Sequence, residues 1–370
     1  MTKQRIYIYI FVIKGGTIDI TAHEIQRDGS VKELLAASGG AWGGTKVDEN
    51  FINLLIKVLG REFIMRYQRE CPGDWLKLRV DFEQRKKAVK PKDDNCSISI
   101  QLSFSIAGKY TEVTGKNIEQ VIRSTSVQGV RFNNGNIVFD ESIVRGLFDP
   151  VTSQIVSHIQ RELRSPKASG IGFILLVGGF GECAFVQDAI SKAVRPRIKV
   201  LCPSEAGISI IKGAVLFGHT PSVVRSRISR KTYGVEQYMP FDKKKHTESR
   251  RKMLEVGPRC LVFRKFVEKG QSLDLNEERK FDFKVIESDQ KRLLFTLLSA
   301  DTDTVSYPDE PQVKIMGKLI VEMPDTTKGL DRGGDLKVFF GATEIYVEAA
   351  EEVEYGEGNK AHTTIDFLAD

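Results

Sequence analysis

A glycine turn near the N-terminus carries the first residue types that could bind a phosphate. Gly15, Gly16 and Thr17 stand between two stretches with the composition of strands. Glycines at such a turn let backbone amides approach a phosphate closely, and a threonine hydroxyl adds a donor. Asp19 follows two residues later, where a carboxylate could hold a water bound to magnesium. By itself a Gly-Gly hairpin is more often only a turn.

A second glycine turn follows a continuous apolar stretch, residues 171–177. Gly178, Gly179 and Phe180 end that stretch and lead into a helical pattern over residues 183–194. A turn from a strand into a helix N-terminus is a ready site for an anion or a ribose phosphate. The motif is neither GxGxxG nor a Walker A loop. Tight packing of the helix on the strand explains the glycines equally well.

The order of three motifs is more informative than any one of them. Pro203-Ser204-Glu205-Ala206 opens a helical pattern over residues 207–217 and alone reads as an ordinary helix cap. It follows the second turn by about 25 residues, and the second turn follows the first by about 160. This order resembles the second half of the fold shared by actin, sugar kinases and the heat-shock ATPases.

Four further phrases narrow the resemblance to the heat-shock branch. Residues 82–87 (Phe-Glu-Gln-Arg-Lys-Lys) are similar to the segment that flanks adenosine in that branch. Residues 178–183, 202–207 and 230–235 resemble the divergent 12A/12B branch of the heat shock 70 kDa family. The likeness extends over nearly all 370 residues.

The resemblance implies an ATP site, with Mg²⁺ as its companion ion, and assigns a role to ten residues. The residues that would contact phosphate are Gly15, Gly16 and Thr17. The residues that would border the ribose and adenine are Glu83, Lys86 and Lys87, and those that would face the adenosine are Gly178, Gly179 and Phe180. Asp19 is the carboxylate that remains for a catalytic role.

Two departures from the family pattern put catalysis in doubt. Val12 stands where the family's second phosphate motif has an aspartate, and Lys14 stands where it has its first glycine. Lys14 could reach a phosphate as a point charge, but we expect it to block the turn instead. No first phosphate motif precedes residue 6, so we expect an N-terminally truncated chain with an incomplete nucleotide cleft. Phosphoryl transfer needs charges from several directions at once, which predicts little ATPase activity.

Hydrophobic periodicity predicts an α/β fold in two domains. The resemblance implies that residues 1–218 form the second lobe of an actin-like, heat-shock ATPase domain and that residues 219–370 form a β-rich domain in the position of a peptide-binding domain. In the first domain we expect strands at 6–13, 18–25, 31–37, 98–104 and 171–177. In the second we expect strands at 261–267, 280–287, 292–299, 317–323, 336–349 and 362–368.

Composition limits the remaining classes of function. The formal charge of +6 is mild for 370 residues, and the basic runs near 225–231 and 243–246 carry no interleaved aromatic stripe, so we expect no nucleic-acid partner. Five scattered cysteines without a CxxC pair favour a reducing compartment, and no metal site is expected. The resemblance implies a cytoplasmic location. We also expect no transmembrane segment.

The sequence therefore predicts an ATP-binding, chaperone-like protein whose partners are protein or peptide clients. An alternative is a non-enzymatic interaction module that acts through its β domain. A kinase of the same superfold is a third reading, but the sequence offers no catalytic aspartate loop to serve as base for a substrate hydroxyl. Retained affinity for Mg-ATP separates the first reading from the second.

Overall fold

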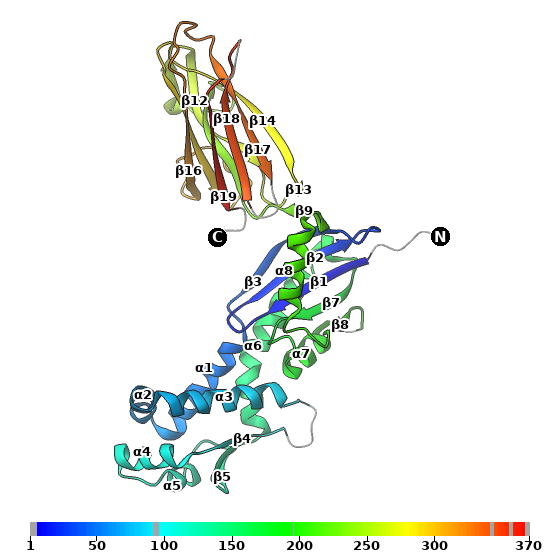
Figure 1. Cartoon of the computed structure of the whole chain (residues 1–370), viewed down its shortest axis with the longest axis vertical. Helices are drawn as coiled ribbons and strands as arrows, with labels where there is room; N and C mark the ends of the chain where they lie inside the picture. The colour runs from blue at the N-terminus through cyan, green and yellow to red at the C-terminus, as the bar shows by residue number, and fades with distance from the viewer. Residues whose placement is uncertain (1–5, 92–95, 195, 341–343, 355–357, 367–370) are drawn as a thin grey trace. The chain divides into compact units, whose positions relative to one another are not determined.

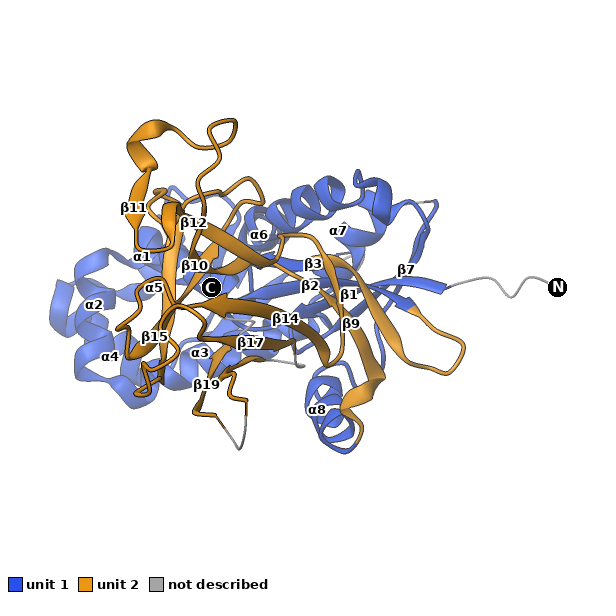
Figure 2. Cartoon of the chain, turned by 90° about the horizontal axis from the view of Figure 1, so that it is seen from above, with its two compact units in different colours: residues 1–24, 37–219 blue, residues 25–36, 220–370 orange. Residues whose placement is uncertain are grey.

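The computed structural model describes residues 6–91, 96–194, 196–340, 344–354 and 358–366 (Figure 1). The chain divides into two compact units (Figure 2). Unit 1 comprises residues 1–24 and 37–219, and unit 2 comprises residues 25–36 and 220–370. Unit 1 mixes helices and strands, whereas unit 2 is built almost entirely of strands.

A sheet with parallel central pairs organises unit 1. Its strands are β1 (Ile6–Ile13), β2 (Ile18–Ile25), the second half of β3 (Val31–Gly40), β7 (Ile171–Val177) and β8 (Lys199–Leu201), in the order β3-β2-β1-β7-β8. β1 runs parallel to β7, so that Val12 lies opposite Val177. Parallel strands are covered on both faces, which explains why both read as continuous apolar runs. The turns that follow β1 and β7 consequently lie at the same edge of the sheet.

A long helix and a shorter one pack together in the layer beside this sheet (Figure 1). They are α6 (Glu141–Glu162) and α7 (Ala184–Val194). Phe148 of α6 stacks on Phe185 of α7 with ring centroids 4.2 Å apart. A last helix, α8 (Ser209–His219), is apolar in composition yet buries no residue within the described chain.

Three consecutive helices and a small sheet form an arm of unit 1 (Figure 1). The helices are α1 (Gly44–Leu59), α2 (Arg61–Glu70) and α3 (Pro72–Ala88). The sheet consists of β4 (Ile98–Gln101), β5 (Val130–Asn133) and β6 (Asn136–Phe139), accompanied by helices α4 (Phe104–Thr114) and α5 (Ile118–Arg123). Phe51 of α1 stacks on Phe82 of α3 with centroids 3.8 Å apart, and this stack fixes the distance between the two helices.

Unit 2 contains two antiparallel sheets that share one apolar core. The first sheet has the order β11-β12-β10-β15-β16, from the strands β10 (Thr232–Pro240), β11 (Lys252–Leu254), β12 (Gly257–Val267), β15 (Arg292–Ala300) and β16 (Val313–Glu322). The second has the order β14-β17-β18-β19, from the strands β14 (Glu277–Lys284), β17 (Gly333–Phe340), β18 (Glu344–Glu351) and β19 (Lys360–Asp366). Buried side chains of both sheets, such as Leu297 and Val338, belong to the same cluster.

Two shorter strands complete unit 2. They are β9 (Val224–Ile228) and β13 (Ser272–Asp274), which pair antiparallel. β9 also runs parallel to the beginning of β3, at Val31 and Lys32, which is why residues 25–36 group with unit 2 rather than with the rest of β3.

The α/β class predicted from the sequence is confirmed, and the structure corrects several boundaries. The strand expected at 98–104 ends at Gln101, because the Ser103 hydroxyl accepts the amide of Ile106 and begins α4. The strand expected at 336–349 is two strands, β17 and β18. The part of the last expected strand at 367–368 lies outside the described residues. Within the described chain, no helix combines the length and the apolar character that a membrane crossing requires.

Candidate functional site

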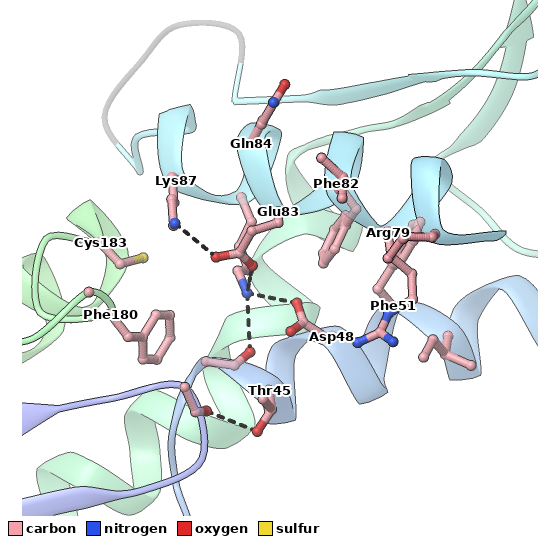
Figure 3. Close-up of a pocket in the computed structure, with 17 residues that line it drawn as sticks. Thr45, Asp48, Phe51, Arg79, Phe82, Glu83, Gln84, Lys87, Phe180 and Cys183 are labelled. Carbon is pink, nitrogen blue, oxygen red and sulfur yellow. Dashed lines mark hydrogen bonds and ion pairs between the residues drawn. The ribbon is translucent and has the colours of Figure 1, made fainter. Parts of the chain in front are cut away.

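One pocket of about 540 Å³ lies in unit 1 between α1, α3 and the turn that follows β7 (Figure 3). This volume falls in the range that small-molecule sites occupy. The wall residues contributed by α1 and its start are Gly44, Thr45, Asp48, Phe51 and Ile52. Those contributed by α3 are Leu76, Arg79, Val80, Phe82, Glu83, Gln84, Lys86 and Lys87, and the rest are Gly15, Gly179, Phe180 and Cys183.

The start of α1 binds the first glycine turn rather than open solvent. The Thr45 amide donates to the carbonyl of Gly15 at 2.7 Å, and the Thr45 hydroxyl donates to the same oxygen at 2.9 Å. The amide of Gly43 donates to the carbonyl of Gly16 at 3.3 Å. These bonds satisfy amides that a helix start leaves unpaired. The turn and the helix are therefore held as one piece of the pocket wall.

Two glycines allow this close packing. A Cβ on Gly43 would lie 2.2 Å from the carbonyl oxygen of Gly15, so no side chain fits there. Gly178 has φ of 88°, and a Cβ on it would lie 2.5 Å from the carbonyl oxygen of Ile13. Only glycine takes such a conformation without strain. The turns after β1 and β7 can therefore touch at the sheet edge, where the Phe180 amide donates to Ile13.

The second and third sequence motifs also lie side by side. The Gly178 amide donates to the carbonyl of Ala206 at 2.7 Å. The Glu182 carboxylate accepts the amide of Gly207 at 2.8 Å. The Pro203–Ala206 segment thus supports the turn after β7, which is a structural reason for the spacing seen in the sequence.

A buried lysine is the electrostatic centre of the pocket wall. Lys86 is only 3% exposed, and its Nζ lies 2.7 Å from the Asp48 carboxylate and 3.3 Å from the carbonyl of Gly44. It also forms an ion pair with Glu83. Figure 3 shows Asp48 reaching it from α1 and Glu83 from α3. A charged group can be buried here because each of its three donors has an acceptor.

Glu83 is shared between two lysines at the rim. Lys87, which is more exposed, approaches the other carboxylate oxygen at 3.2 Å. Burial raises the pKa of Glu83. The hydrogen bond and the charge of Lys86, followed by those of Lys87, lower the same pKa by more than burial raises it, so the net shift is downward. Glu83 is therefore a carboxylate at neutral pH, with its acceptor oxygens toward the pocket.

An aromatic ring and a thiol close the other side. The Phe180 ring lies with its centroid 6.0 Å from the Lys86 Nζ and packs against Gly44, where an added Cβ would lie 3.1 Å from the ring. Cys183 is buried, and this burial raises the pKa of its thiol. A thiol held in its neutral form is a packing group here rather than a nucleophile.

The carboxylate of the first turn is already paired. Lys14 Nζ lies 2.9 Å from the Asp19 carboxylate, and both side chains are about half exposed. Among the described residues, no group of three or more His, Cys, Asp or Glu side chains is arranged to hold a metal ion. The residues present at this turn therefore do not fit Mg²⁺ as they stand.

The structure brings six of the ten sequence-predicted site residues to one pocket. Those six are Gly15, Glu83, Lys86, Lys87, Gly179 and Phe180. The other four, which stand beside the pocket without lining it, are Gly16, Thr17, Asp19 and Gly178. Their roles toward a ligand stay predictions.

Sequence reasoning missed part of the wall. It did not single out Asp48 as a site residue, whereas the structure shows Asp48 to be a partner of Lys86 in the pocket wall. It also missed Arg79, Leu76 and Val80 of α3. The sequence shows only that Leu76 and Val80 are four residues apart and would share one side of a helix. Their exposure, and the burial of Lys86 on the same helix, are evident only in the structure.

Comparison with known proteins identifies relatives over almost the whole chain. The chain is 34% identical to heat shock 70 kDa protein 12B from Homo sapiens over 367 residues, which is 96% of this chain. It is 31% identical to heat shock 70 kDa protein 12A from Homo sapiens over 360 residues. No protein-family model matches. This homology fits an actin-like ATPase fold with β-rich portions and agrees with the fold class predicted from the sequence.

The match covers only part of each relative. The chain spans about half, 53%, of the length of these two proteins. A more distant match, 22% identical over 234 residues, is the chaperone protein DnaK from Thermoplasma volcanium. That match covers 62% of this chain and 34% of DnaK.

Proposed function

Because the chain belongs to the 12A/12B branch of the heat shock 70 kDa family, we propose that the unit 1 pocket binds the adenosine part of ATP. The observation that carries this proposal is the convergence of Gly179, Phe180, Glu83 and Lys87 on one cavity of about 540 Å³. These residues come from segments about 95 residues apart in the sequence, and the family resemblance assigns all of them to adenosine.

The chemistry of the wall suits a nucleoside. The Glu83 carboxylate accepts hydrogen bonds from ribose hydroxyls, and charge-assisted bonds of this kind are stronger than neutral ones. The Lys87 stem and the Phe180 ring supply apolar surface to the base, and the Lys87 ammonium can lie over its face. Lys86 holds Glu83 in place, because the two side chains form an ion pair at the pocket wall.

We further propose that ATP hydrolysis is slow. Lys14 pairs with Asp19, which is the carboxylate that the turn retains, and Val12 supplies no second carboxylate. Phosphoryl transfer depends on groups that neutralise the developing charge on the transferred phosphate. Gly15, Gly16 and Thr17 can still approach a phosphate, but with little help from a metal ion. Residue Asp19 is thus a weak catalytic candidate.

The biological role that follows is that of a chaperone-like protein of the cytoplasm. Relatives named as heat shock proteins and as a chaperone support protein or peptide clients as partners, with unit 2 as the part that meets them. If nucleotide does not bind, the remaining role is a non-enzymatic interaction module that acts through the two sheets of unit 2.

Isothermal titration of the folded chain with ATP, ADP and GTP, each with Mg²⁺, tests the nucleotide site. We expect micromolar affinity for ATP and ADP and weaker binding of GTP. Lys87→Gln should weaken ATP binding about fivefold, the loss of roughly one exposed charge contact. Lys192→Gln is the matched control, because Lys192 is similarly exposed and paired in α7 but lies outside the pocket.

Two results would overturn the proposal. One is the absence of nucleotide binding by a sample whose circular dichroism shows it to be folded. The other is equal weakening by Lys87→Gln and Lys192→Gln, which would place the nucleotide elsewhere.

A further inference from the structure

The pocket extends well beyond the residues assigned to adenosine. Phe180, Glu83 and Lys87 stand at one end, and Arg79 reaches from α3 toward α1 at the other (Figure 3). The wall around Arg79 is apolar, because it includes Ile52 of α1 together with Leu76 and Val80 of α3. The proposed function assigns nothing to this second end.

At this end of the pocket, helix α3 exposes apolar side chains, although it buries a charged one. Leu76 is 59% exposed and Val80 is 48% exposed, although α3 buries the cation of Lys86. Leu76 and Val80 are four residues apart and therefore lie on the same side of the helix. Apolar side chains at the mouth of a cavity lose contact with water when a ligand with an apolar part fills it.

The charges of the pocket leave one cation uncompensated. The carboxylates in its wall, Asp48 and Glu83, are both paired with Lys86, and Glu83 is paired with Lys87 as well. The guanidinium of Arg79 has no hydrogen bond or ion pair to any residue that the structure describes. A cation beside apolar surface selects a partner that carries a negative charge on an apolar body.

We propose that this end of the pocket is a subsite for a small amphipathic anion, an aliphatic or aromatic carboxylate. Its apolar part packs on Leu76 and Val80, and its carboxylate pairs with Arg79. The subsite is separate from the adenosine end and does not depend on nucleotide binding.

Three probes of one chain length test the proposal: octanoate, octanol and octylammonium, titrated below their aggregation concentrations into the full chain. Octanoate should bind about fivefold more tightly than octanol, because a partly exposed ion pair contributes that much. Octylammonium should bind most weakly. Arg79→Gln should remove the preference for octanoate over octanol, and Val80→Ser should weaken both by about threefold, as expected for partial loss of apolar contact.

Matched controls separate this subsite from other apolar surface. Ile211 of α8 is 67% exposed and lies outside the pocket, so Ile211→Ser should leave all three affinities unchanged. Equal or tighter binding of octylammonium would overturn the proposal, and so would failure of all three probes to bind folded protein or an unchanged preference in Arg79→Gln. If ATP binds but octanoate shows no preference, only the subsite is wrong; if octanoate binds as expected but ATP does not, only the nucleotide proposal is wrong.

Discussion

Two lysine–carboxylate clusters of unit 1 have the same chemistry and opposite surroundings. Lys86 is 3% exposed and is bound by Asp48, Glu83 and a backbone carbonyl. Lys14, which follows β1, has one carboxylate partner in Asp19, and both side chains are about half exposed. The first cluster joins α1 to α3, whereas the second only spans one turn.

The difference in burial indicates which of the two clusters stabilises the fold. Water screens an exposed ion pair and competes for its groups, so the Lys14–Asp19 pair contributes little to stability. A buried cation has no such alternative, and removing it would leave Asp48 without its lysine and Glu83 with the exposed Lys87 alone. Lys86 is therefore required for the shape of the pocket, while Lys14 can change with little effect on folding.

The largest expected effect is that of Lys86→Met. This change should lower the free energy of unfolding by about 3 kcal/mol, because Asp48 and Glu83 lose their common partner in a partly buried site. Urea unfolding followed by far-UV circular dichroism measures it. Lys87→Met is the control: Lys87 shares Glu83 but is exposed, so the expected loss is below about 1 kcal/mol. Equal losses in the two variants would refute the assigned difference in burial.

The next effect separates two glycines beside the pocket, Gly43 before α1 and Gly16 in the turn after β1. Gly43→Ala should destabilise the protein by about 2 kcal/mol, since its Cβ would lie 2.2 Å from the backbone of Gly15 and the turn would have to move. Gly16 lies in the same turn as Gly15, and a Cβ added to it would have no atom within 4 Å. Gly16→Ala should therefore change stability by less than about 0.5 kcal/mol. Thermal unfolding of both variants distinguishes a packed turn from a loose one.

Lys14→Gln should have a small effect on stability and a specific effect on the ligand. Loss of an exposed pair is expected to cost at most about 0.5 kcal/mol. The change also frees the Asp19 carboxylate, so the difference in ATP affinity with and without Mg²⁺ should grow relative to wild type. Paired titrations with and without the metal measure it. An unchanged difference would mean that Asp19 does not face the bound phosphate.

Much of the fold could be predicted from the sequence because local patterns dictate it. The alternating run after residue 18 and the continuous runs of β1 and β7 specify strands by composition alone, and the glycines between them specify turns. Element ends were less predictable. The Ser103 hydroxyl begins α4 two residues after β4 ends, and this cap outweighed the strand pattern that the sequence shows at Phe104.

The site was predicted only where a motif marks it. Glu83 and Phe180 belong to recognisable sequence motifs. Asp48 and Arg79 do not, and they line the pocket because α1 packs on α3 through the Phe51–Phe82 stack. No single-sequence pattern specifies that contact, since the two rings are about 30 residues apart and separated by another helix. The pairing of Lys14 with Asp19 was also missed, and it depends on the geometry of a turn rather than on spacing.

The smallest effect is the part of the pH dependence of stability that the buried cluster contributes. Lys86 and Lys87 hold the pKa of Glu83 below its ordinary value of 4.5 against the opposing effect of burial. A carboxyl group with a lowered pKa in the folded state stabilises the protein above its unfolded pKa, and this contribution is lost as the pH falls through the lower, folded value. Urea unfolding between about pH 3 and pH 6 should therefore show a loss of stability below about pH 4.5.

Lys86→Met should make the slope of stability against pH shallower, because the main group that lowers the pKa of Glu83 is gone. Lys14→Gln leaves the surroundings of Glu83 intact and should keep the wild-type slope. An equal change of slope in both variants would mean that the acid sensitivity comes from carboxylates elsewhere in the chain.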